Sequence, residues 1–331
     1  PYGMHVCKVY LPGAECSTGS LGHGLAVSAG MAFSARQKKQ EHRVFCMMGD
    51  GETCEGSVWE AANTAGSYKL GNLIGIVDKN SQLMTSFANE SMSYEHYAER
   101  WEAFGWNAVE IDGHDMNQIV DSLDNLPPPN SDKPTVIIAN TVKGKGVSFM
   151  EGPFALKNGQ GLYKWHAGAP DDDAFEAGYG EIIERINTRL KESGLEPLHT
   201  ELIEEREKNR KRLKDTAEKV VNAYGEALVE MGARRDDLIV LDADLSADCG
   251  LRPFENKYPE RFIENGIAEQ DMVSTAGGLA LQGFLPIVNS FGVFLASRAN
   301  EQIYNNATEN TKIIYVCHYA GLIPAGPGKS H

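Results

Sequence analysis

The segment from Val44 to Asn80 constrains the fold of this chain most strongly. Val44–Met48 is a short apolar run that ends at Gly49-Asp50-Gly51, and 72–77 is a second apolar run that ends at Asp78-Lys79-Asn80. Each run predicts a buried strand followed by a tight turn, and 55–70 between them predicts a helix. This order predicts a parallel α/β sheet that binds its ligand at the carboxyl ends of the strands.

Two oxygen-bearing side chains, Asp50 and Asn80, directly follow these predicted strands. Carboxylate and amide oxygens are the ligands that Mg²⁺ and Ca²⁺ prefer, whereas zinc favours nitrogen and sulfur. The pair therefore predicts a site for one of these two ions. The alternative is that Asp50 is a turn residue and Asn80 caps a strand end, with no ligand.

The overall composition is that of a globular enzyme. The 331 residues are 42% hydrophobic and 23% charged, a length that suggests two domains. A net charge of −15 argues against nucleic acid or an anionic membrane as a general partner. No apolar run approaches the roughly 18 residues of a membrane span, and no signal peptide is evident. The six cysteines lack paired metal spacing, so we expect reduced thiols and a cytoplasmic location.

Further elements follow from the periodicity of apolar residues along the chain. Helices are predicted at 25–36, 94–104, 176–191 and 216–231, and strands at 106–111, 134–140, 238–241, 262–264, 286–290 and 313–316. A loop is predicted over 153–170. His114 and Asp115 are expected to form a turn and a helix cap, and Thr18 or Ser20 could cap the first helix.

The domain boundary is expected in the most highly charged stretch of the chain. Residues 201–214 read ELIEEREKNRKRLK, which predicts a surface linker helix. We therefore expect a first domain at 1–195, a linker helix at 196–215 and a second domain at 216–331. Because the chain begins in a loop and stops inside another, we also expect it to be incomplete at both ends.

The motifs GDGETCEG, KLGNLIGIVDKN, STGSLGHG, TVKGKGVSFME, WHAG and GIAEQ together resemble the transketolase family, whose members depend on thiamine diphosphate. The resemblance runs from about residue 11 to the end, apart from the linker. It implies two α/β thiamine-diphosphate-binding domains, each a parallel sheet flanked by helices: a diphosphate-binding (PP) domain followed by a pyrimidine-binding (Pyr) domain. It also implies Mg²⁺ or Ca²⁺ as the ion and a homodimer with sites at the interface between protomers.

The same resemblance assigns candidate residues for cofactor binding. Those implied to contact thiamine diphosphate are Ser20, Leu21, Gly22, Gly49, Asp50, Gly51, Glu55, Asn80, His166, Asp244, Glu269, Phe291 and Phe294. Those implied to hold the ion are Asp50, Asn80 and the backbone carbonyl of Gln82. In the family, two acids form a hydrogen bond with each other. Glu269 matches one of these acids and Glu55 matches the other.

Four residues are implied to take part in catalysis. Glu269 would exchange a proton with the aminopyrimidine ring, so it must be buried, which raises the pKa of a carboxyl. His166 would lie over the thiazolium ring, where an imidazole can pass a proton near neutral pH. His318 and His331 would stabilise the developing alkoxide of the sugar. As structural alternatives, Glu269 could be a helix-start acid and Phe291 and Phe294 core aromatics.

The family activity is transfer of a two-carbon ketol unit from a ketose to an aldehyde through a thiamine carbanion. Gly326-Pro327-Gly328-Lys329 stands where the family has an acidic loop, and Asp248 stands near the place of phosphate-binding residues. We therefore expect a substrate other than a standard pentose phosphate. Two alternatives stay open: a thiamine enzyme that decarboxylates a 2-oxo acid, similar to deoxyxylulose-phosphate synthase, and a non-catalytic partner chain. Another, companion chain could supply missing segments.

Overall fold

The computed structural model describes residues 5–82, 95–159, 162–166, 170–199 and 220–320. The chain divides into two compact units. The first contains 1–141 and 225–331, and the second contains 142–224. The predicted linker helix at 196–215 lies largely outside the described residues, and so does His331. No helix within the described ranges is long and apolar enough to cross a membrane.

The first sheet has four parallel strands in the order β1-β2-β4-β3. Its strands are β1 (Val44–Gly49), β2 (Leu73–Lys79), β3 (Asn107–Asp112) and β4 (Thr135–Asn140). Each begins and ends within two residues of its prediction. The prediction succeeded because each strand is an apolar run bounded by turn residues. In the register of β1 and β2, Gly49 pairs with Asp78, so Asp50 and Asn80 follow neighbouring strand ends as expected.

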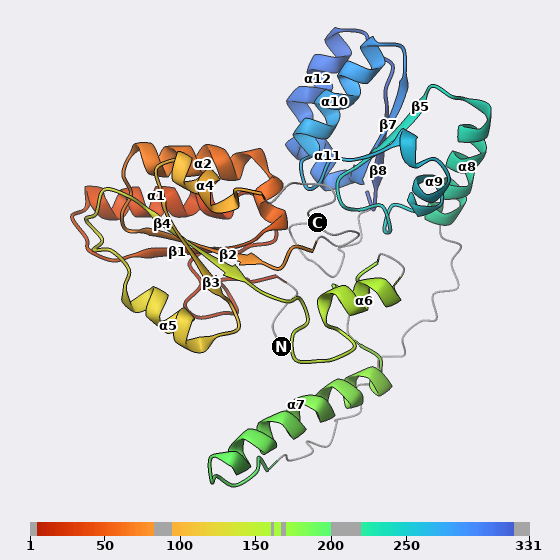
Figure 1. Ribbon diagram of the computed structural model, residues 1–331. Coiled ribbons are helices and arrows are strands. Elements are labelled where there is room, and N and C mark those ends of the chain that lie inside the picture. Colours follow the sequence, from red (N-terminus) through yellow and green to blue (C-terminus); the bar gives the residue numbers. More distant parts are fainter. Residues whose placement is uncertain (1–4, 83–94, 160–161, 167–169, 200–219, 321–331) are drawn as a thin grey trace. The chain divides into compact units, whose positions relative to one another are not determined.

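Helices cover both faces of this sheet (Figure 1). The helices α1 (Gly24–Gln37), α2 (Gly56–Ser67) and α4 (Tyr97–Ala103) lie on one face, and α5 (Met116–Asp124) lies on the other. Trp101 and Trp106 are buried in the core under the first group, with ring centroids 5.2 Å apart. Small residues such as Ala29 and Ala62 allow α1 and α2 to pack closely on the strands.

The helix ends settle two of the predictions. Asp115 caps α5 through a hydrogen bond that its Oδ1 accepts from the Asn117 N–H, at 2.9 Å, so the predicted cap is confirmed. The alternative in which Thr18 or Ser20 caps α1 does not hold, because His23 occupies that position and makes no side-chain cap bond. The glycine-rich segment before α1 continues as non-helical chain up to Gly24.

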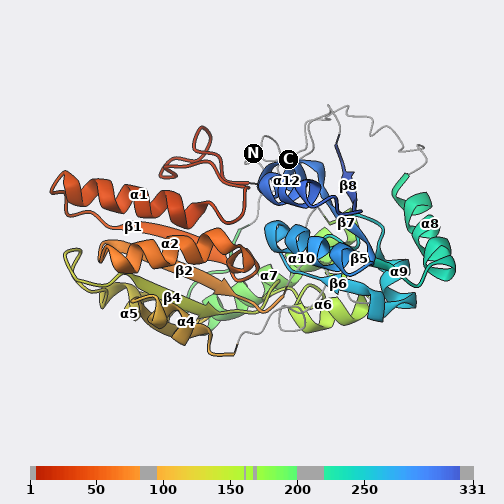
Figure 2. The ribbon, with the colours of Figure 1, turned by 90° about the horizontal axis from the view of Figure 1, so that it is seen from above.

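The second sheet is also parallel, with strand order β6-β5-β7-β8. Its strands are β5 (Leu238–Asp242), β6 (Phe262–Glu264), β7 (Leu285–Phe291) and β8 (Ile314–His318). Its helices are α8 (Val220–Arg234), α9 (Arg252–Lys257), α10 (Glu269–Leu281), α11 (Gly292–Arg298) and α12 (Asn300–Thr308). Figure 2 shows α10 running along the strands, and its residues Met272, Val273 and Ala276 join the core of this sheet. The expected α/β fold with two parallel sheets is therefore confirmed.

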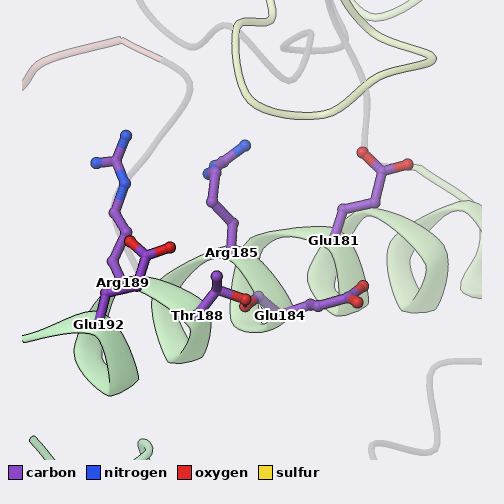
Figure 3. A pocket seen from close by; sticks show the side chains of 6 residues that line it. All are labelled: Glu181, Glu184, Arg185, Thr188, Arg189 and Glu192. Atoms are coloured by element: carbon purple, nitrogen blue, oxygen red, sulfur yellow. The ribbon is translucent and has the colours of Figure 1, made fainter. Parts of the chain in front are cut away.

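The second unit contains α6 (Gly152–Asn158) and α7 (Asp172–Glu192). The loop predicted over 153–170 is wrong at its start, because α6 forms there with Pro153 in its first turn, where a missing N–H costs nothing. The helix α7 fixes the loop at 146–148. Ser148 donates two hydrogen bonds to Glu181, both 2.7 Å, and Arg185 donates to the Gly146 carbonyl at 2.7 Å. Figure 3 shows Glu181 and Arg185 rising from the same side of α7.

Candidate functional site

The turn after β1 and the turn after β2 are tied together by the Asp50 carboxylate. Asp50 is 1% exposed; its Oδ1 accepts from the Gly51 N–H at 2.9 Å, and its Oδ2 accepts from the Ser81 N–H at 2.6 Å. The Asn80 side chain stabilises the turn after β2 in the same way, because its Oδ1 accepts a hydrogen bond from the Gln82 N–H at 3.0 Å. The two predicted ion ligands therefore belong to one linked pair of loops.

The donor atoms in these loops suit a hard divalent cation. They are a buried carboxylate, an amide oxygen and the Gln82 carbonyl, all oxygen, which is what Mg²⁺ and Ca²⁺ require. Gln82 is itself buried, and within the described ranges its side-chain amide atoms have no hydrogen-bond partner. No cluster of three or more His, Cys, Asp or Glu residues that could hold a metal occurs in the described parts of the chain. The predicted ion ligands, Asp50, Asn80 and the Gln82 carbonyl, include one carboxylate and therefore would not form such a cluster. This ion site stays a prediction.

The glycine-rich segment before α1 packs directly on the turn after β1. The Gly22 N–H donates to Glu52 Oε1 at 2.8 Å, and Ser57 Oγ donates to the Gly22 carbonyl at 2.8 Å. Gly22 has φ +82°, and an added Cβ would lie 2.7 Å from Ser57 Oγ and 2.9 Å from Glu55 Cβ. Burial raises the pKa of Glu52, although the Gly22 hydrogen bond opposes this. Ser20 and Leu21, which precede Gly22, are exposed.

The strand ends of the second sheet carry a group of acids. Asp242 is fully buried and pairs in register with Glu264 on β6. Glu264 Oε1 accepts from the N–H of Asp244 at 2.8 Å and from the N–H of Gly266 at 2.9 Å. Burial first, then the Glu264 carboxylate, raises the pKa of Asp242 well above its ordinary value, and burial raises the pKa of Glu264 to about 7. Glu264 therefore holds the turn that carries Asp244.

Glu269 is the first residue of α10 and is 2% exposed, as the resemblance requires. A carboxylate at this position also receives the favourable field of the helix N-terminus. Phe291 and Phe294 lie at the start of α11, with stacked rings whose centroids are 5.7 Å apart. Tyr319 packs edge-on against Phe291 at 5.0 Å. The predicted acid and the predicted aromatic wall thus lie at the same edge of the second sheet.

His318, the last residue of β8, lies at this edge as well. One ring nitrogen, Nε2, is 3.3 Å from the Oδ1 of Asn289, a fully buried residue of β7. Asn289 is fixed in turn because its Nδ2 donates to the carbonyls of Leu241 and Ile287. Burial lowers the pKa of His318, which favours the neutral imidazole.

Arg298 joins two of the predicted acids. Its Nη1 lies 2.9 Å from Glu55 Oε1 and 3.0 and 3.1 Å from the two oxygens of Glu269. The resemblance predicts a direct hydrogen bond between these acids, whereas here the guanidinium contacts both. Burial raises the pKa of Glu55 to about 8, although Arg298 opposes the increase. Glu55 therefore holds a proton at neutral pH.

His166 belongs to the second compact unit. Its Nδ1 is 2.9 Å from Lys143 Nζ, and the Lys143 ammonium also lies 4.9 Å from the ring centroid of Tyr163. By area the side chain remains exposed, but surrounding atoms desolvate the ring. This desolvation, and then the Lys143 charge, lowers the pKa of His166 to about 4. The ring is therefore neutral near pH 7, and its place over a cofactor stays a prediction.

Three functional candidates were not predicted from the sequence: Glu52, Glu264 and Arg298. Glu52 lies within GDGETCEG and Glu264 lies five residues before Glu269, so their proximity to predicted residues was the available signal. Arg298 follows Glu269 by a whole helix, a strand and a second helix. Only the packing of α10 and α11 brings these two charges together.

Comparisons with known proteins identify the family of the chain. The family model for the transketolase thiamine diphosphate binding domain matches residues 4–161, and that for the transketolase pyrimidine binding domain matches residues 218–331. Transketolase-like protein 2 of Mus musculus is 35% identical over 328 residues, which are 96% of this chain and 50% of that protein. The chain thus spans about half the length of the curated transketolases that it matches.

A second relative is one subunit of a transketolase. This subunit of the apulose-4-phosphate transketolase of Phocaeicola vulgatus is 40% identical over 185 residues, which are 56% of this chain and 62% of that protein. The match to the solved structure of transketolase from Campylobacter jejuni covers 92% of this chain and 52% of the Campylobacter jejuni chain. The sequence identity is 24% and the TM-score is 0.41. With both domain models matched in the expected order, the chain belongs to the transketolase family.

Proposed function

We propose that this chain binds thiamine diphosphate with a divalent ion and transfers a two-carbon ketol unit from a ketose donor to an aldehyde acceptor. The observation that carries the proposal is Glu269, an acid buried at the N-terminus of α10, at the same edge of the second sheet as Phe291 and Phe294. Burial of a carboxylate costs free energy because the charge loses its water, so a buried acid at this place favours a functional role.

Each candidate residue has a definite task in this proposal. Asp50, Asn80 and the Gln82 carbonyl hold the ion, and the N–H groups of the turn after β1 face the diphosphate. Glu269 binds the ring nitrogen of the aminopyrimidine and exchanges a proton there, while Phe291 packs on the ring face. Bound thiamine diphosphate supplies the electron sink for carbon–carbon cleavage.

Histidines serve the substrate side. His318 is kept neutral by burial and gives its Nε2–H to Asn289, so its Nδ1 accepts a hydrogen bond from a sugar hydroxyl and can take the proton of that hydroxyl. His166 takes the corresponding place near the diphosphate, where a neutral ring beside Lys143 accepts a hydrogen bond. His331 completes the set as a proposal from the resemblance alone.

The substrate is proposed to differ from a standard pentose phosphate. The reason is Asp248, which stands near the expected phosphate-binding residues and would repel a phosphate group. The relative from Phocaeicola vulgatus, named for apulose-4-phosphate, is consistent with an unusual sugar. Because that relative is named as one subunit, it also supports a companion chain for the assembled enzyme. From the resemblance alone we propose a dimer whose sites lie at the interface between protomers. We propose a cytoplasmic location, which the reduced cysteines favour.

A donor screen tests the proposal. Purified chain, alone and with any co-purifying chain, is supplied with Mg²⁺, thiamine diphosphate and either ketoses, phosphorylated ketoses or pyruvate. The proposal expects an aldehyde product without CO₂, and loss of this activity in Glu269→Gln. Release of CO₂ from pyruvate would instead place the chain among 2-oxo acid decarboxylases. Full activity in Glu269→Gln would contradict the role of that acid, and xylulose 5-phosphate turnover at ordinary transketolase rates would contradict the substrate class.

A further inference from the structure

Arg298 ends α11 and lies among the buried acids of the candidate site. One nitrogen of its guanidinium, Nη1, contacts both oxygens of Glu269, at 3.0 and 3.1 Å, and is 2.9 Å from Glu55 Oε1. The contacts with Glu269 are hydrogen bonds, whereas that with Glu55 is an ion pair without hydrogen-bond geometry. All three side chains are at most 10% exposed.

The position of the guanidinium is fixed from several sides. Its Cζ lies over the Phe294 ring, 4.5 Å from the centroid, where the aromatic face attracts a cation. The backbone of the same residue is anchored, because Gln270 Nε2 donates to the Arg298 carbonyl at 3.1 Å. Its second nitrogen, Nη2, is buried and donates to no acceptor in the described parts of the chain. The contacts with the acids are therefore the polar interactions that hold the head group.

The charge balance of the cluster depends on this residue. Buried carboxylates next to one another repel, and removing one partner of a buried ion pair leaves an uncompensated charge. Arg298 lowers the pKa of Glu55, against the larger effect of burial. Among these acids, Glu269 receives the two hydrogen bonds, so its carboxyl group is the one whose orientation Arg298 sets.

We propose that Arg298 is a positioning residue for the cofactor-binding acid: it orients the Glu269 carboxyl group and balances the charge that Glu269 and Glu55 share. This inference rests on the proposed function, because it assigns to Glu269 the contact with the aminopyrimidine. A carboxyl group held by one guanidinium nitrogen keeps a fixed direction toward that ring. Without Arg298, the carboxyl group of Glu269 rotates, and Glu55 keeps its proton to a higher pH.

Four variants separate this role from simple packing. Arg298→Met removes the charge at similar volume, and Arg298→Lys keeps a charge on a single ammonium. Glu55→Gln, alone and combined with Arg298→Met, removes the second acid. The matched control is Arg261→Met. Arg261 is 12% exposed, lies 4.1 Å over the Tyr258 ring, donates to two backbone carbonyls and has as its ion-pair partner an exposed acid, Glu260.

Two measurements are made on each purified variant. The first is the dissociation constant of thiamine diphosphate with saturating Mg²⁺ from pH 6 to 9, by calorimetry. The second is the pH dependence of unfolding of the cofactor-free chain. A hydrogen bond to a charged group corresponds to about 10- to 100-fold in affinity, so Arg298→Met should weaken cofactor binding by that factor. Below pH 8 the factor should stay the same when Glu55→Gln is added, because Glu55 already holds its proton there.

The cofactor-free chain gives an independent readout. Because the pKa of Glu55 is raised to about 8, the proton held in the folded state contributes stability that is lost as pH rises from 4.5 through 8. Arg298→Met should extend this loss to higher pH, since the cation that lowers the pKa is gone. Arg298→Lys should restore the pH dependence of unfolding but only part of the affinity for thiamine diphosphate. Arg261→Met should change neither the pH dependence of unfolding nor that of cofactor binding.

The outcomes distinguish the inference from the function on which it rests. Wild-type chain that binds thiamine diphosphate, together with Arg298→Met that binds it within twofold and with the same pH dependence, would overturn the inference alone. The same pH shift in Arg261→Met would also overturn it, because packing would then suffice. A wild-type chain that fails to bind thiamine diphosphate would overturn the proposed function and the inference together.

Discussion

Glu264 offers the sharpest test of how the second sheet positions its turns. Its Oε1 accepts the N–H groups of Asp244 and Gly266, both residues with positive φ, +58° and +69°. Glu264→Ala leaves both N–H groups without this acceptor. At about 1–2 kcal/mol for each hydrogen bond, we expect the free energy of unfolding of this sheet to fall by roughly 2–4 kcal/mol. Glu264→Gln keeps the acceptor oxygen and should cost about 1 kcal/mol or less.

The same residue gives the sheet a pH dependence of known sign. Burial raises the pKa of Glu264 to about 7, and the neighbouring Asp242 has a raised pKa as well. The folded state therefore binds more protons than the unfolded state above pH 4.5, so stability is lost as pH rises from 4.5 through 7. Glu264→Gln should remove much of this loss, because the amide does not titrate.

The assay must report on the second sheet alone. All four tryptophans lie at 59, 101, 106 and 165, so tryptophan fluorescence reports on other parts of the chain. Hydrogen exchange of peptides from β5 to β7 at pH 5, 6, 7 and 8 measures local opening of this sheet. The control is Glu260→Gln, an acid whose side chain is 68% exposed. An exchange rate in Glu264→Ala equal to wild type, or an unchanged pH dependence in Glu264→Gln, would refute the reasoning.

Three further predictions concern the first sheet and the second unit. Gly22→Ala should destabilise the chain by about 1–3 kcal/mol in chemical unfolding, because its Cβ would press on Ser57 at a positive φ; Gly30→Ala, with open space around its Cβ, is the control and should not destabilise. Asp50→Asn should weaken thiamine diphosphate binding at least tenfold and abolish the effect of EDTA on the melting temperature, and an undiminished EDTA effect would contradict the ion site. His166 should titrate near pH 4 by NMR, and Lys143→Met should raise that pKa, so an unchanged value would show that the ammonium has no influence.

The sheets could be predicted from the sequence because their strands are apolar runs with clear ends. Val44–Met48 and Phe262–Glu264 became β1 and β6 with almost no change. The short helix α6 was missed because its glycine, proline and asparagine weaken the helical pattern. Domain limits over 196–215 stay predictions, since most of that stretch lies outside the described residues.

The candidate site was predictable only where it follows from motifs. Asp50 and Asn80 could be placed together because both follow neighbouring parallel strands. The roles of Glu264 and Arg298 could not be predicted, because a charge on one helix or strand acquires its partner through packing. A pattern in the sequence reports which residues are adjacent along the chain, whereas an ion pair such as Arg298 with Glu269 depends on how two helices pack.

The most direct test of the account is proton exchange at C2 of thiamine diphosphate bound to this chain with Mg²⁺, in D₂O and followed by NMR after rapid quenching. This measurement needs no knowledge of the sugar substrate. If Glu269 activates the cofactor, exchange in the wild type should be much faster than in free thiamine diphosphate, and Glu269→Gln should lose the acceleration. Exchange as slow as in the free cofactor, or equally fast in Glu269→Gln, would contradict the central claim.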